Sequence, residues 1–200
     1  MKRIRRAHPR FPFLLLALLP ALSGCATLQH MAALRQVDFS LDRVSGISLA
    51  GVEISRVQRY EDLGLMDAAR IAAAMTSGRL PLDLTLHVQA DNPQGNGQAS
   101  MVALDWTLLL QEKETVSGGL TQAVLIPNGG TADIPLAVSL DLLDFFQGSG
   151  RDLVNLALSL AGGEAPPTTV SLRATPTIET PLGPIRYPQP ITIARRTVRN

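Results

Sequence analysis

Few residues of this chain could carry out chemistry by themselves. Its 200 residues include one cysteine, Cys25, and two histidines beyond the N-terminal leader, His30 and His87. A cysteine thiolate is a nucleophile, and an imidazole can act as a general base or as a metal ligand. Because there is only one cysteine, an intramolecular disulfide and a Cys-rich zinc site are both excluded.

Whether this chain could be an enzyme depends largely on these two histidines. A catalytic triad or a zinc site would need one of them beside suitable partners. His30 falls in a short connector, and His87 should point outward from a strand. The patterns G-x-S-x-G, H-E-x-x-H and the P-loop are missing from the sequence. We therefore expect no enzyme, no metal site and no cofactor, although a spatial cluster of scattered Asp and Ser residues is invisible in a linear sequence.

Cys25 follows a segment with the layout of a secretory signal peptide. Residues 1–10 hold five basic side chains, residues 11–19 form an apolar run, and Leu22-Ser23-Gly24-Cys25 comes next. The apolar run is shorter than the roughly 20 residues of a transmembrane helix. The tetrapeptide resembles the bacterial lipobox, which implies cleavage between Gly24 and Cys25 and lipidation of the Cys25 sulfur. The alternative is an ordinary signal peptide with an incidental cysteine.

A lipidated Cys25 would make a membrane the first partner of this chain, because two or more acyl chains form a stable anchor. In the lipoprotein sorting pattern, Asp after the cysteine retains the protein in the inner membrane. Ala26 stands there instead, so the resemblance implies the outer membrane, with the protein facing the periplasm, over the inner membrane. Residues 25–36 are expected to form the lipidated cysteine and its tether, and the tether residues 26–36 reach at most about 36–40 Å when extended.

Charge argues against a nucleic-acid partner. The leader, residues 1–24, holds five of the 18 basic residues and none of the 17 acidic ones, so the remainder is net negative by four. A mildly acidic domain lacks the electrostatic basis for binding phosphate backbones. With 46% hydrophobic and 18% charged residues, the chain has the composition of a folded protein.

Residues 37–200 should form one domain built from strands. Apolar residues alternate with polar ones at period two, the pattern of a half-buried strand, and turn residues separate the runs. Such strands with short polar turns indicate a mainly β fold, an antiparallel sandwich. Long strands are predicted at 82–90, 102–110 and 132–140, another strand begins with residues 170–174, and shorter ones are predicted near 37–44, 51–57, 119–126 and 191–198.

Two helices are predicted as additions to the sandwich, at 62–77 and 151–161. The first carries an apolar stripe of Leu65, Ala68, Ala69, Ala72 and Met75. One hypothesis is a lid for a hydrophobic ligand, formed by Leu65, Ala69, Ala72 and Met75 over an apolar cavity. The other is an extra helix that is simply packed on the domain. Trp106 is expected to be a core residue.

Part of the chain resembles the late embryogenesis abundant type 2 (LEA type 2) domain, also called the water stress and hypersensitive response domain. The resemblance spans about residues 37–146 and rests on Val37–Leu41, Leu84–Pro93, Leu104–Leu110, Ser117–Gly119, Ile126–Gly130 and Ile134–Val138. It implies a sandwich of immunoglobulin or fibronectin type III shape, a link to stress and desiccation, and no catalytic residues. The helix at 62–77 and the C-terminal extension after about residue 147 depart from that pattern.

The most specific element of the resemblance is an apolar strand that ends in Asn92-Pro93 and is followed, roughly fifteen residues later, by a second long apolar strand. We interpret Asn92-Pro93 as a structural turn, because proline presets φ and the asparagine side chain can bond to backbone. The leading hypothesis is therefore a non-catalytic envelope lipoprotein for maintenance or stress protection. The alternatives are a module that binds or transfers lipid or another hydrophobic ligand, and an accessory subunit of an envelope protein complex.

Overall fold

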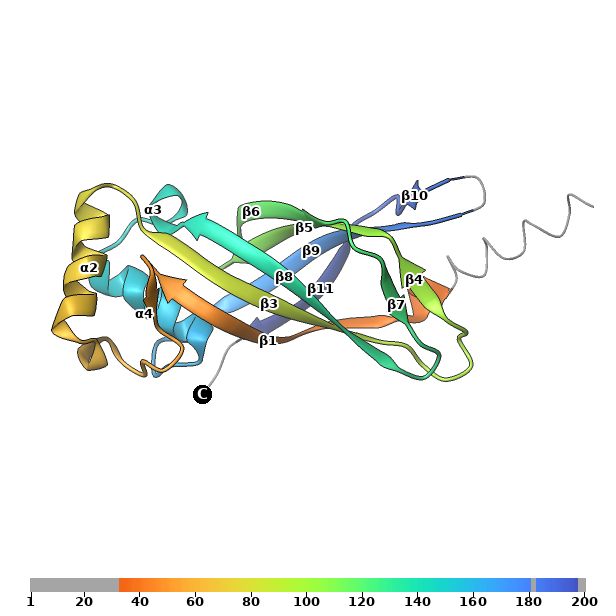
Figure 1. Ribbon diagram of the computed structural model, residues 1–200, viewed down its shortest axis with the longest axis horizontal. Helices are drawn as coiled ribbons and strands as arrows, with labels where there is room; N and C mark the ends of the chain where they lie inside the picture. The colour runs from red at the N-terminus through yellow and green to blue at the C-terminus, as the bar shows by residue number, and fades with distance from the viewer. Residues whose placement is uncertain (1–32, 181–182, 198–200) are drawn as a thin grey trace, which may run out of the picture.

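The computed structural model describes residues 33–180 and 183–197, and side chains only as far as residue 193. Its strands form two main antiparallel sheets and one short pair (Figure 1). The first sheet has the order β2 (Val52–Glu53), β1 (Asp38–Leu49), β3 (Pro81–Asp91), β8 (Thr131–Asp141). The second has the order β10 (Ile185–Arg186), β9 (Thr169–Ile178), β5 (Ala103–Leu110), β6 (Lys113–Leu120), with β11 (Ile191–Thr197) also paired to β9. The short pair is β4 (Ala99–Met101) with β7 (Val124–Ile126).

The predicted mainly β sandwich is confirmed. Alternation along the long strands places one set of side chains in a single core between the sheets. Trp106 of β5 is 6% exposed within this core. Its indole ring fills the place of a side chain at Gly118 on the neighbouring strand, where an added Cβ would lie 2.4 Å from the ring. The long predicted strands therefore have the expected faces.

Helices gather at one end of the sandwich (Figure 1). They are the 3-10 turn η2 (Tyr60–Asp62), α2 (Leu65–Thr76), α3 (Leu142–Phe145) and α4 (Gly150–Ala161). Both predicted helices exist, and the second begins at a capping box formed by Ser149 and Asp152. The first starts at residue 65 and not 62, because residues 60–62 form the separate turn η2 and Gly64 is the N-cap.

Three predicted strands differ from the observed ones. The segment 119–126 is divided between the end of β6 and β7, and the segment 51–57 contains only the two-residue β2. The strand expected at 37–44 continues to Leu49. Most of β6 was missed because it is an exposed edge strand that contains Lys113, Glu114 and two glycines, so it shows no apolar alternation.

Opposite the helices lies the end where the chain enters the domain (Figure 1). Residues 33–36 are helical there, with Ala33 and Leu34 buried, although the sequence placed them in the tether. The Asn96 side chain donates a hydrogen bond to the Ala33 carbonyl at 2.8 Å. The chain is thus fixed to the domain from residue 33 onward. Within 33–180 and 183–197, no helix combines the length and apolar character needed to cross a membrane.

Candidate functional site

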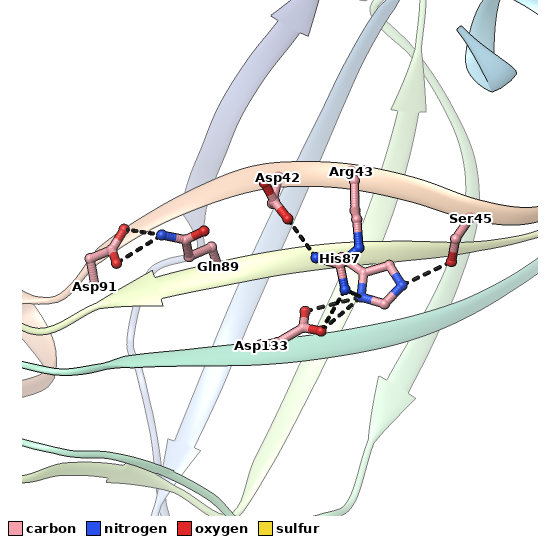
Figure 2. A network of polar contacts seen from close by, with 7 residues as sticks. All are labelled: Asp42, Arg43, Ser45, His87, Gln89, Asp91 and Asp133. Carbon is pink, nitrogen blue, oxygen red and sulfur yellow. Dashed lines mark hydrogen bonds and ion pairs between the residues drawn. The ribbon is translucent and has the colours of Figure 1, made fainter.

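A polar cluster lies on the outward face of the β1–β3–β8 sheet and centres on His87 of β3 (Figure 2). The strand register explains its composition. Arg43 of β1 is directly opposite His87, while Ser45 of β1 and Asp133 of β8 are its diagonal neighbours. These neighbours cover the imidazole, and only 14% of the His87 side chain is exposed.

Two irregularities in β1 bring Arg43 and Ser45 to this face. In a regular strand, residues two apart share a face. Leu41 and Ile47 are in the core, whereas Arg43 and Ser45 between them contact His87 on the outside. The register shifts once between residues 41 and 43 and again between residues 45 and 48. Each β-bulge reverses the facing of the odd-numbered residues, first outward and then back into the core.

The hydrogen bonds of the cluster form a chain from hydroxyl to imidazole to carboxylate. Ser45 Oγ lies 2.9 Å from His87 Nε2. The other ring nitrogen, Nδ1, lies 2.9 Å and 3.0 Å from the two oxygens of Asp133. A hydroxyl, a base and a carboxylate that orients the base have this connectivity in serine hydrolases.

Arg43 competes with Asp133 for the same ring nitrogen. Its Nη2 lies 2.9 Å from His87 Nδ1 and 3.0 Å from Asp133 Oδ2. If Nδ1 carries the proton, it donates to Asp133, and Nε2 accepts from the Ser45 hydroxyl. If Nε2 carries the proton, Nδ1 accepts from Arg43, and Nε2 donates to Ser45. Only the first tautomer lets His87 withdraw a proton from Ser45.

The contacts within the cluster shift the pKa values of its charged members Asp133 and Arg43. The hydrogen bond with His87, followed by the charge of His87 and the contact with Arg43, holds the pKa of Asp133 below its usual range. The Arg43 pKa is raised, chiefly by its hydrogen bond to Asp42. Because 48% of the Asp133 side chain is exposed, water screens much of its field.

The predicted turn residues lie away from this cluster, at the end where the chain enters. Asn92 is 4% exposed, and its Nδ2 donates to the carbonyls of Gly97, Ile126 and Pro127 at 2.8, 3.1 and 3.0 Å. Its Oδ1 accepts from Asn96 at 2.6 Å. The side chain joins the loop after β3 to the turn before β8, and Pro93 follows it in that loop. This geometry fits the structural interpretation of the motif.

The predicted lid residues are only partly brought together. A pocket of about 120 Å³ lies between α2 and α4, and Ala72 and Met75 line it. Leu65 is 86% exposed and Ala69 is also exposed, so the predicted inward stripe is wrong at these positions. Ile71 is the buried residue of α2. Binding pockets for small molecules usually exceed about 300 Å³.

Larger grooves open elsewhere among the described residues. One of about 240 Å³ lies at the entry end beside Leu34, Arg35 and Tyr187. Another, of about 490 Å³, lies over β5, β6 and β9, where Arg173 and Arg186 are among its lining residues. These arginines pair with Glu114 at 2.7 Å and Asp105 at 2.9 Å. The described residues contain no group of three or more His, Cys, Asp or Glu side chains that could hold a metal ion.

Several predicted residues cannot be placed, because Gly24, Cys25, Ala26 and His30 lie outside the described residues. Conversely, the sequence prediction placed His87 on an outward face but did not identify Ser45 and Asp133 as its partners. The available signal was the position of Asp133 on the outward side of its own predicted strand. The strand register and both bulges were needed to bring the three residues together.

No protein-family model matches this chain, and no curated protein matches it at a significant level. Among solved structures, it is similar to a candidate late embryogenesis abundant (LEA) protein, with 13% identity, TM-score 0.38, and coverage of 88% of this chain and 78% of that one. A protein from Archaeoglobus fulgidus has 13% identity and TM-score 0.33, over 60% and 87% of the two chains. A structural-genomics target designated SoR45 has 10% identity and TM-score 0.36, over 82% and 89%. At scores this low, the similarities carry no argument about function.

Proposed function

We propose that this chain is a bacterial lipoprotein, anchored through Cys25 in the outer membrane and facing the periplasm. Its domain then acts through its surface in envelope maintenance or protection against stress such as desiccation, a role that by itself needs no catalysis. The observation that carries the proposal is the position of the single cysteine, at the end of Leu22-Ser23-Gly24-Cys25 and shortly after an apolar run with a basic start. The LEA type 2-like strand motifs support the protective role.

The helical residues 33–36 are packed on the domain, which limits the distance between the domain and the membrane. Seven residues lie between Cys25 and Ala33, and the eight residue-to-residue steps that join them span at most about 26–29 Å when extended. Ala33 is 4% exposed and accepts a hydrogen bond from Asn96, so the folded domain begins at Ala33. The entry end of the sandwich therefore stays close to the membrane surface.

The pockets favour this role over binding of a hydrophobic ligand. The largest groove described above, about 490 Å³, is lined by the ion-paired Arg173 and Arg186 and is too polar for an apolar ligand. The space beneath α2 is about 120 Å³, well below the range of about 300–1,000 Å³ usual for small-molecule sites. The core between the sheets is lined by buried apolar side chains that contact one another in one cluster. A packed interior leaves the surface as the working part of the domain.

A second candidate function is that of an accessory subunit of an envelope complex, favoured by α2. Leu65 and Met66 are 86% and 79% exposed, and exposed large apolar side chains mark protein interfaces. Photocrosslinking from position 66 in intact cells should give one identified envelope protein, with position 112 as the control. Equal crosslinks from both positions would exclude an interface at α2.

The anchor is tested by fractionating cells that express the wild type or Cys25→Ala. The wild type should cofractionate with the outer membrane, and the variant should not. Thr27→Ala is the matched control and should behave as wild type. Survival of drying, measured in a deletion strain complemented with each form, should be restored by the wild type and Thr27→Ala alone. If Cys25→Ala still cofractionates with the outer membrane, the anchor proposal is wrong.

A further inference from the structure

The space beside Ser45 is open to a reacting group. Ser45 is only partly buried, and Gly46 follows it at a φ of +59° within the second bulge. A Cβ placed on Gly46 would meet no other atom within 4 Å beyond its chain neighbours. Because Ser45 itself lies on the outward face of the sheet, a carbonyl group can approach it from solvent. Bulges are common beside active sites, where they re-aim a side chain.

From this access and the Ser45–His87–Asp133 hydrogen bonds, we propose that Ser45 is an activated nucleophile that cleaves small acyl esters. His87 is the general base, and Asp133 is the positioning residue. The inference goes beyond the proposed function, since anchoring and envelope protection need no catalysis. The charged neighbours Arg43 and Asp133 favour a short, polar acyl group over a long apolar chain.

The reaction is an ordinary two-step hydrolysis. Ser45 Oγ attacks the ester carbonyl carbon while its proton moves to His87 Nε2. The bond to the leaving oxygen then breaks, the alcohol takes that proton, and the acyl group stays on Ser45. Water attacks the acyl carbon with His87 again accepting the proton, and the carboxylic acid leaves as Ser45 regains its hydrogen. Ester and water become acid and alcohol, with no change of oxidation state.

Gly46 supplies the hydrogen-bond donor for the developing oxyanion. In many hydrolases this donor is the backbone N–H of the residue that follows the nucleophile. Here that residue lies within the bulge, where the register with β3 is interrupted between Ser45 and Ser48. Glycine also permits the left-handed backbone that this position requires.

Arg43 favours the unreactive tautomer of His87. Its Nη2 contact with His87 Nδ1, at 2.9 Å, stabilises the tautomer in which Nε2 bears the proton and cannot accept another. Removing the guanidinium leaves Asp133 as the partner of Nδ1 and selects the reactive tautomer. Loss of this charged neighbour should therefore raise the reactivity of Ser45.

The test uses the full-length chain purified from membranes in detergent, with a fluorophosphonate probe and p-nitrophenyl acetate. The wild type should be labelled, and peptide mapping should place the label on Ser45. Ser45→Ala and His87→Gln should lower labelling and acetate release by tenfold or more. Ser48→Ala, on the same strand and likewise part-buried, is the control and should match the wild type.

Arg43→Gln separates a catalytic cluster from a merely structural one. It should raise labelling several-fold and shift the ¹⁵N signals of His87 toward the tautomer protonated on Nδ1. A structural role predicts no gain. The proposal is overturned if the folded wild type is not labelled above its heat-denatured form, if the label maps to another residue, or if Arg43→Gln lowers labelling. Peptide mapping on the wild type decides the matter even if a variant fails to fold, and neither result bears on lipidation of Cys25.

Discussion

The two ends of the sandwich are held together by different forces. At the entry end, the buried amide of Asn92 joins two loops, and Asn96 ties the incoming chain at Ala33. At the other end, α4 buries seven of its residues against the sheets, and α2 adds only Ile71 to the buried set. Hydrogen bonds from an amide are directional, whereas apolar packing is not. The loops that are fixed by directional hydrogen bonds therefore lie at the end nearest the proposed anchor.

The largest effect should come from opening the packing at the helical end. Leu158 of α4 is fully buried, and removing its side chain leaves a cavity. Leu158→Ala should lower the free energy of unfolding by about 3 kcal/mol. Urea denaturation measures this effect, with Leu65→Ala on the exposed face of α2 as the control. A similar loss in both variants would show that α4 does not carry the packing of this end.

Breaking the amide contacts at the entry end should cost somewhat less. Asn92→Ala removes the donor to three carbonyls, which are then left without it in a buried loop. We expect a loss of about 2 kcal/mol. Asn128→Ala removes one exposed contact to Gly95 and should cost well under half as much. If the two asparagine variants unfold at the same urea concentration, burial of Asn92 is not what secures this end.

Acid should weaken the helical end before the entry end. The Asp152 pKa is lowered by hydrogen bonds from the side chain and backbone of Ser149 at the start of α4. A lowered pKa in the folded state gives stability that is present above the ordinary value and is lost as the pH falls through the lowered one. Amides such as Asn92 do not titrate. Hydrogen exchange of the first turn of α4 should therefore rise below about pH 4, and Asp152→Asn should abolish that dependence.

The smallest expected effect is a gain at the helical end. Ser159 of α4 is 2% exposed, and its hydroxyl has no hydrogen-bond partner among the described residues. Ser159→Ala removes this unsatisfied group and introduces a better helix former. We expect stabilisation by roughly 0.5–1 kcal/mol in urea denaturation. A loss of stability would mean that the hydroxyl is bonded, for example through water.

The sequence predicted the features that depend on local periodicity. The strand containing His87 and the helix α4 follow from period-two and period-3.6 patterns. The inward face of α2 could not be predicted, because packing against α4 and η2, and not the stripe through Leu65, determines that Ile71 is buried. The partners of His87 were hidden for a related reason. The bulges in β1 reverse the facing of Ser45, and period-two alternation cannot show which residues a bulge turns to the other face.

The measurement that tests the central claim most directly is the mass of the N-terminal peptide of the full-length protein, isolated from bacterial membranes. The account predicts a peptide that begins at Cys25 and carries diacylglycerol and an amide-linked acyl chain. A peptide that contains unmodified Cys25, or one that begins at another residue, would contradict it.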